Sequence, residues 1–106
     1  MPKYLLQVNY TLDGVKGVVS KGGTARKAAA QSVAESMGGT LESFYFAFGD
    51  TDVFAVADLP DNTAAAALAL TVSASGGGTV RTVVLLTPEE VDAATQKDVP
   101  YTPPGQ

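Results

Sequence analysis

Hydrophobic and polar residues alternate along the first ten residues of the chain. Tyr4, Leu6, Val8 and Tyr10 fall on one side of this segment, and the residues between them fall on the other. A period of two is typical of a strand with one buried face, because successive side chains of a strand point to opposite faces of a sheet. The pattern predicts a strand over residues 3–10.

Two alanine-rich segments carry the signals of helices. Thr24 is a suitable N-cap for a helix over residues 25–37, and the glycines at 38–39 would end it. Asp61 is a suitable N-cap for a second helix, which the glycines at 76–78 would end.

Aromatic and β-branched residues predict three further strands. Residues 40–48 and 52–58 would form a hairpin through a three-residue turn at 49–51, and residues 80–86 would form the last strand.

The remaining segments carry weaker patterns. Residues 11–23 contain four glycines among a few valines, so we expect a broken helical turn followed by a loop. Thr87, Pro88 and two acidic residues favour a short helix over residues 88–97. The proline-rich end of the chain should be extended.

The order strand-helix-strand-strand-helix-strand predicts an α+β fold of the ferredoxin-like type. In this fold an antiparallel sheet carries both helices on one face, and a short C-terminal helix would follow here. We expect one domain over residues 1–98 and an extended tail over residues 99–106.

A three-residue hairpin turn determines which side chains share a face of this sheet. The Phe-rich face would contact the alanine-rich helices, and the opposite face would also be apolar and uncovered. A second copy packing sheet against sheet would cover it, so we expect a homodimer or a higher oligomer of dimers. The first face would hold Phe44, Phe46, Phe54 and Val56, and the second Ser43, Tyr45, Val53, Ala55 and Ala57.

Composition excludes several classes of function. The net charge is −4 and the seven Lys and Arg residues form no basic stripe, so we expect no nucleic-acid partner. No apolar stretch is long enough to span a bilayer and no signal-peptide pattern opens the sequence, so we expect no membrane partner and a cytoplasmic location. The chain has no Cys and no His, which excludes Ser-His-acid triads and the usual zinc sites. We expect no metal and no cofactor.

Three charged residues are candidates for ligand binding. Asp52, which directly follows the predicted hairpin turn and lies two residues after Asp50, could act as a base or hydrogen-bond acceptor, although Asp is also an ordinary hairpin residue. Arg81 could bind a carboxylate or phosphate, or form an ion pair across a dimer interface. Arg26, in the first turn of a predicted helix, could reach an anionic ligand or be a solvated surface residue.

Three polar residues complete the candidate set. Tyr10 and Tyr45 could each point a hydroxyl into a cavity, and each could equally fill core volume. Asn9, next to Tyr10, carries the same two interpretations.

The sequence as a whole resembles the GYD domain family over roughly residues 3–90. The resemblance implies a ferredoxin-like fold of the dimeric α/β-barrel type, in a family whose members mostly lack an assigned activity. One departure is Thr51, which stands between Asp50 and Asp52 where the name of the family implies a Tyr. The matching residues are Tyr4, Tyr10-Thr11, Gly14, Arg26, Gly38 to Tyr45, Phe48-Gly49, Asp52, Leu59-Pro60-Asp61, Ala66 to Leu70, Ser73 to Gly76 and Val80-Arg81-Thr82.

Two functions of different classes remain open at this stage. The first is an oligomeric module that binds a small, partly apolar ligand or serves a structural or interaction role. The alternative is a cofactor-independent enzyme, similar to the monooxygenases and isomerases that use the dimeric α/β-barrel. The absence of His favours the first, because few titrating groups remain for catalysis.

Overall fold

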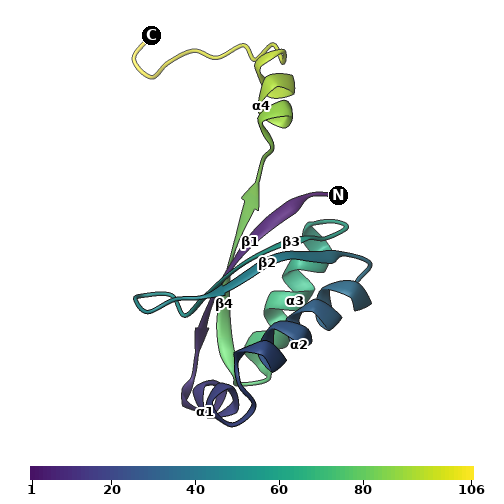
Figure 1. The fold of residues 1–106 in the computed structure, drawn as a ribbon. Helices are drawn as coiled ribbons and strands as arrows, with labels where there is room; N and C mark the ends of the chain where they lie inside the picture. Colours follow the sequence, from purple (N-terminus) through teal and green to yellow (C-terminus); the bar gives the residue numbers. More distant parts are fainter.

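The computed structural model describes all 106 residues and confirms the ferredoxin-like α+β fold. A four-stranded antiparallel sheet in the order β2-β3-β1-β4 carries α2 and α3 on one face (Figure 1). No helix is both long and apolar enough to cross a membrane. The elements are β1 (Lys3–Tyr10), α1 (Leu12–Lys21), α2 (Gly23–Ser36), β2 (Thr40–Phe46), β3 (Val53–Asp58), α3 (Asn62–Ala74), β4 (Gly78–Leu85) and α4 (Pro88–Thr95).

The prediction of a broken turn and loop over residues 11–23 is wrong, because most of this segment forms α1. The hydroxyl of Thr11 caps the helix by accepting from the Gly14 N–H, and Asp13 and Lys21 suit the two ends of its dipole. Gly14 is required by packing: a Cβ there would lie 1.9 Å from the carbonyl oxygen of Gly77. A glycine that reads as a helix breaker in sequence therefore marks a close approach of two backbones.

The other helices begin and end near their predicted bounds, and their caps explain why. Asp61 accepts from the Ala64 N–H at the start of α3, as expected. Thr87 and Glu90 form a reciprocal capping box at the start of α4. The start of α2 differs from the prediction, since its N-cap is Gly22 rather than Thr24 and no side chain caps it.

The predicted partition of the hairpin between the two faces is wrong for β3. Phe44 pairs with Ala55 and Phe46 pairs with Val53, so these four side chains share the face that the helices cover. The pairing extends one step further, because the Ala47 N–H donates to the Asp52 carbonyl oxygen and the turn contains four residues, 48–51. A turn one residue longer than predicted moves every side chain of the facing strand to the other side of the sheet.

A β-bulge in β2 also changes which residues face the helices. The register shifts between Leu41 and Ser43, so the extra residue is Glu42. Without this bulge Leu41 and Phe44 would point to opposite faces, whereas both line the space beneath the helices.

The core lies between the sheet and the two covering helices, and it is small. Tyr4 is fully buried, and its hydroxyl donates to Oδ1 of Asn62 at 2.7 Å, which joins β1 to the start of α3. The sheet and the segment after β3 supply most of the buried apolar side chains, with one alanine from each covering helix. These residues are Tyr4, Leu6, Ala34, Val53, Ala55, Ala57, Leu59 and Ala65.

The chain leaves an unusually large surface exposed. Its accessible area is 7204 Å², about 1,700 Å² more than the roughly 5,500 Å² typical of a folded monomer of this mass. Part of the excess is an arm: every residue from Pro88 to Gln106 is exposed, and α4 projects away from the layered body (Figure 1). The radius of gyration is accordingly 16.9 Å, against about 13 Å for a compact domain.

We predict that Gly39→Ala destabilises the protein and that Gly17→Ala does not. A Cβ at Gly39 would lie 2.1 Å from the carbonyl oxygen of Asp58, so the backbone must shift, at a cost of about 1–3 kcal/mol. Gly17 lies inside α1 with open space around it, so Ala there should stabilise by about 0.5–1 kcal/mol. Urea unfolding of both variants measures the two free energies, and equal stability of the two would contradict the packing described here.

Candidate functional site

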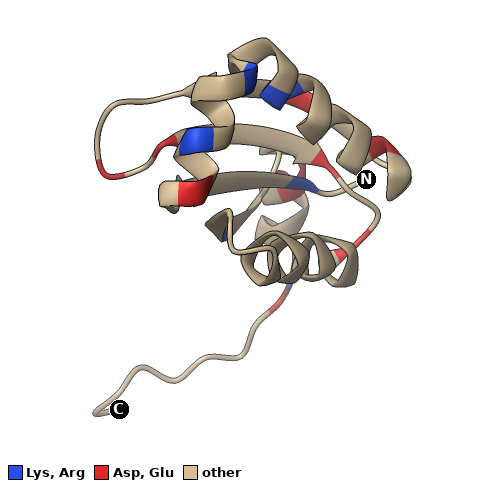
Figure 2. Ribbon diagram, turned by 90° about the horizontal axis from the view of Figure 1, so that it is seen from below, with Lys and Arg blue, Asp and Glu red and all other residues tan.

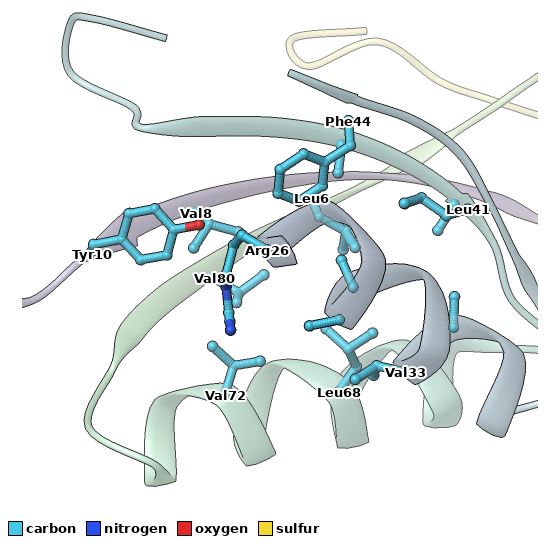
Figure 3. Close-up of a pocket in the computed structure, with 15 residues that line it drawn as sticks. Leu6, Val8, Tyr10, Arg26, Val33, Leu41, Phe44, Leu68, Val72 and Val80 are labelled. Carbon is cyan, nitrogen blue, oxygen red and sulfur yellow. The ribbon is translucent and has the colours of Figure 1, made fainter. Parts of the chain in front are cut away.

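A cavity of about 130 Å³ lies between the sheet and the helices α2 and α3 (Figure 3). Fourteen of its 15 lining residues are hydrophobic. The strands supply Leu6, Val8, Tyr10, Leu41, Phe44, Ala55, Ala57 and Val80, and the helices supply Arg26, Ala29, Ala30, Val33, Ala34, Leu68 and Val72.

The cavity exists because small side chains of α2 face bulky side chains of the sheet. Ala30 and Ala34 end in a methyl group, so they leave space above Leu6 and Phe44. Phe44 also makes an edge-to-face contact with Phe46, with ring centroids 5.4 Å apart. The alanine-rich composition of α2 therefore creates a pocket and not a close-packed interface.

Polar groups occur at one end of this cavity only. The hydroxyl of Tyr10 and the side chain of Arg26 lie at the end bounded by Val8, Val72 and Val80 (Figure 3). The Arg26 guanidinium forms no salt bridge, and both salt bridges of the protein belong to Lys3. The cavity is thus apolar along its length with hydrogen-bond donors at one end.

A second, more polar hollow of about 520 Å³ adjoins the cavity at this end. It lies between α1, the start of α2 and the turn before β4, and it shares Tyr10, Arg26 and Ala29 with the cavity. Lys21 and Asp13 of α1 line its outer part. The end of the cavity marked by Tyr10 and Arg26 is therefore the one that continues into a wider space.

Tyr10 lies where three hollows meet. It also lines a third hollow of about 430 Å³, between α1 and the loop after β2, together with Phe46, Phe48 and Asp52. Because β1 ends at Tyr10 and α1 begins two residues later, the position of α1 determines how these spaces connect.

Asn9 and Asp52 hold the hairpin loop against the end of β1. The Tyr10 N–H donates to Oδ2 of Asp52 at 2.9 Å, and the Asp52 N–H donates to the Val8 carbonyl oxygen and to Oδ1 of Asn9. Neither side chain lines the apolar cavity. In the structure both have structural partners, and Asp52 reaches only the third hollow.

Tyr45 and Arg81 lie away from the cavity. Tyr45 pairs with Phe54 and Arg81 pairs with Gln7 across the sheet, which places all four on the face without helices. Tyr45 is 71% exposed. Of the six candidate residues, Tyr10 and Arg26 both line the cavity. Tyr45 and Arg81 lie on the opposite face of the sheet.

Most residues of the cavity wall carry no signal in the sequence that marks them as part of a site. Phe44, Leu68 and Val72 carry no chemistry that marks a site, and they read as ordinary core residues. The signal present in the sequence is the contrast between alanine-rich helices and an aromatic strand, which is compatible with close packing as well as with a cavity. Whether these residues pack closely or leave a cavity depends on the volume between the sheet and the helices, which the residue types alone do not reveal.

Charges are interspersed over helices, strands and loops (Figure 2), with one ion-paired cluster on the open face of the sheet. Lys3 Nζ donates to Oδ1 of Asp58 at 3.0 Å and to Oε2 of Glu42 at 3.2 Å. The hydrogen bond to Asp58, followed by that to Glu42, raises the pKa of Lys3 above its ordinary 10.5. Because the pKa of Lys3 is raised in the folded chain, its two ion pairs stabilise the fold at neutral pH. This stabilisation is lost as the pH rises above 10.5 and through the raised pKa.

We predict that Asp52→Ala lowers the free energy of unfolding by roughly 1–3 kcal/mol. The substitution removes the acceptor of the Tyr10 N–H and loosens the loop on β1. Asp50→Ala is the control, since Asp50 is exposed in the same loop and its side chain makes no hydrogen bond. Thermal unfolding compares the variants, and an unchanged midpoint for Asp52→Ala would show that the loop does not depend on this contact.

Comparison with known proteins agrees with this architecture. Neither a curated protein nor a solved structure is significantly similar to the chain. The model of the GYD domain matches residues 4–95, a range that contains every helix, all four strands except Lys3 at the start of β1, and all residues of the cavity. On this match, the chain belongs to the GYD domain family.

Proposed function

We propose that the protein is an oligomeric module that binds a small, partly apolar molecule in the cavity between its sheet and helices. The observation that carries this proposal is the cavity itself, about 130 Å³ in volume and lined almost entirely by hydrophobic side chains. Binding sites for small molecules are typically concave and apolar, with a few polar groups that orient the ligand. Tyr10 and Arg26 would be those groups here.

The volume of the cavity supports a ligand of modest size. An apolar cavity of about 150 Å³ stays dry and binds benzene in another protein. The cavity described here is slightly smaller, so an apolar body of about one aromatic ring would fill it.

The placement of the polar groups supports binding more than catalysis. Catalysis needs a nucleophile and base, or an acid and base, at the reacting atoms of a substrate. Among the side chains that line the cavity only the Tyr10 hydroxyl could exchange a proton, and Asp52 and Tyr45 lie outside it, so no acid–base pair meets there. The geometry therefore favours an anchored ligand over a transformed one.

We further propose that two copies pack through the faces of their sheets that the helices leave open. Leu5, Phe54 and Val56 lie side by side at the centre of this face by the strand register, with Val83 on the adjacent β4. Phe54 is 39% and Val83 is 41% exposed. The chain exposes about 1,700 Å² more than a typical monomer, part of it on the arm, and a standard interface takes roughly 800 Å² from each partner.

The arm and α3 offer further contacts to such an assembly. The apolar side chains of Val91, Val99 and Tyr101 are exposed on the arm, which contributes nothing to the core of its own chain. The helix α3 carries no charged residue, and its Leu70 is 71% exposed. In a dimer the apolar side chains of the arm would gain neighbours that the single chain does not provide, whereas Leu70, on the helix-covered side of the sheet, would do so only in a higher oligomer of dimers.

We predict that benzene binds wild-type protein and that Ala30→Leu abolishes this binding. Leu at position 30 would fill the space over the sheet with three additional carbon atoms. Methyl chemical shifts recorded while benzene is added report occupancy. Ala28→Leu is the matched control, because Ala28 lies on the exposed side of the same helix and does not line the cavity. Equal benzene binding by the wild type and Ala30→Leu would show that benzene binds outside the cavity and would contradict the proposed site.

We predict that the wild type is a dimer or larger at micromolar concentration and that Phe54→Asp dissociates it. A carboxylate at the centre of the open face would be buried without a partner in the dimer but hydrated in the monomer. Light scattering measures the mass of both. Val19→Asp is the control, since Val19 is 81% exposed on α1, away from the sheet face. A monomeric wild type would overturn the dimer proposal.

A further inference from the structure

One charged side chain, that of the exposed residue Arg26, lines the otherwise apolar cavity, and it has no counter-ion in the chain. The Arg26 guanidinium takes part in no salt bridge, although Asp13 lines the same adjoining hollow. A guanidinium presents N–H groups in a planar fork that matches the two oxygens of a carboxylate. The charge at this end of the cavity is therefore complementary to an anion.

A second donor lies at the same end. The hydroxyl of Tyr10 points toward the part of the cavity where the Arg26 side chain runs (Figure 3). The hydroxyl of Tyr10 makes no hydrogen bond within the chain, since the bond to the Asp52 carboxylate comes from the Tyr10 backbone N–H, so the hydroxyl stays available to a ligand. Both donors border the same end of the cavity, the hydroxyl nearer Val8 and the guanidinium nearer Val72 (Figure 3).

The local balance of charge favours a single negative charge on the ligand. The adjoining hollow is lined by two cationic side chains, Arg26 and Lys21, and by one anionic side chain, Asp13. The net charge of the side chains that line the adjoining hollow is thus one positive unit, which the single negative charge of a carboxylate neutralises.

The volume sets the size of the rest of the ligand. Beyond Arg26 the wall consists of Val33, Phe44, Leu68 and other apolar side chains, which offer no hydrogen-bond partner. A polar group on this part of the ligand would lose its hydration without compensation. At about 130 Å³ the space accepts one ring or a branched chain of similar bulk, but not a long acyl chain.

We propose that the ligand of this cavity is a small monocarboxylic acid with an apolar body about the size of one aromatic ring. Its carboxylate is held by Arg26 and Tyr10, and its body lies between the sheet and the alanines of α2. This inference rests on the proposed binding function and names the chemical class of the ligand.

Calorimetric titration with three probes near neutral pH tests the proposal. Benzoate carries both the ring and the charge, benzamide is its neutral counterpart of equal size, and acetate carries the charge without the ring. We expect benzoate to bind the wild type at least tenfold more tightly than benzamide, and acetate to bind far more weakly than either. A tenfold preference for benzoate over benzamide is the difference expected for one charge-assisted hydrogen bond.

Arg26→Gln isolates the contribution of the charge. We expect it to weaken benzoate binding roughly 10- to 100-fold and to change benzamide binding less than about threefold. Lys27→Gln is the matched control, because Lys27 is the next residue of α2, is exposed and does not line the cavity. Tyr10→Phe serves as a second variant that keeps the ring and removes the hydroxyl, and benzoate should bind it several-fold more weakly.

The outcomes separate the ligand class from the binding function. Equal affinities for benzoate and benzamide, or unchanged benzoate affinity in both Arg26→Gln and Tyr10→Phe, would overturn the carboxylate proposal and leave a binding cavity. Failure of benzoate, benzamide and benzene alike to bind the wild type would overturn the proposed function itself. Loss of benzoate binding in Lys27→Gln as large as in Arg26→Gln would show that general surface charge, and not the cavity, holds the anion.

Discussion

The register of β2 against β3 determines the chemistry of both faces of the sheet. It is held at the loop over residues 47–52, where the Ala47 N–H donates to the carbonyl oxygen of Asp52. The carboxylate of Asp52 accepts from the N–H of Tyr10, which ties the same loop to the end of β1. Three strands are thus aligned at one point. A slip of one residue here would exchange the buried and open sides of β3.

The covered face acquires its cavity from this alignment. Phe44 faces the helices beside Ala55, and the bulge at Glu42 brings Leu41 to the same side. Opposite them α2 presents alanines, whose methyl groups cannot fill the space over the larger side chains. A well-packed interior would close such a gap, since voids forfeit contacts. The gap here stays open beside Arg26, and the proposed ligand would fill it.

The small size of the core explains why the open face and the arm remain exposed. Only eight apolar side chains form the buried cluster, which is a small core for 106 residues. Phe54 and Tyr45 face away from the helices, and α4 lies apart from the layered body. An assembly of chains through the open face would bury apolar surface that the single chain leaves in water. The register of β2 against β3 thus determines both the cavity on the covered face and the apolar side chains available to the proposed dimer.

Local signals in the sequence were sufficient for most elements of the fold. The alternation of Tyr4, Leu6 and Val8, the cap at Asp61 and the capping signals at Thr87 act within a few residues, so they can be recognised without knowledge of tertiary contacts. The family resemblance, which the match over residues 4–95 confirms, added the arrangement of these elements. Arg26 and Tyr10 were among the residues selected for their chemistry, but no local signal indicated that they meet.

The features that the sequence did not reveal all depend on contacts between distant segments. Gly14 is accommodated in α1 because the carbonyl of Gly77 approaches it, and the length of the hairpin turn depends on Asp52 bonding to β1. The cavity depends on the volume left between α2 and Phe44, which no single segment contains. Sequence by itself determined the order and the kinds of the elements, because propensity and capping are local. Tertiary structure alone decided the register, the two faces and the cavity, because each is a relation between segments that the chain brings together only on folding.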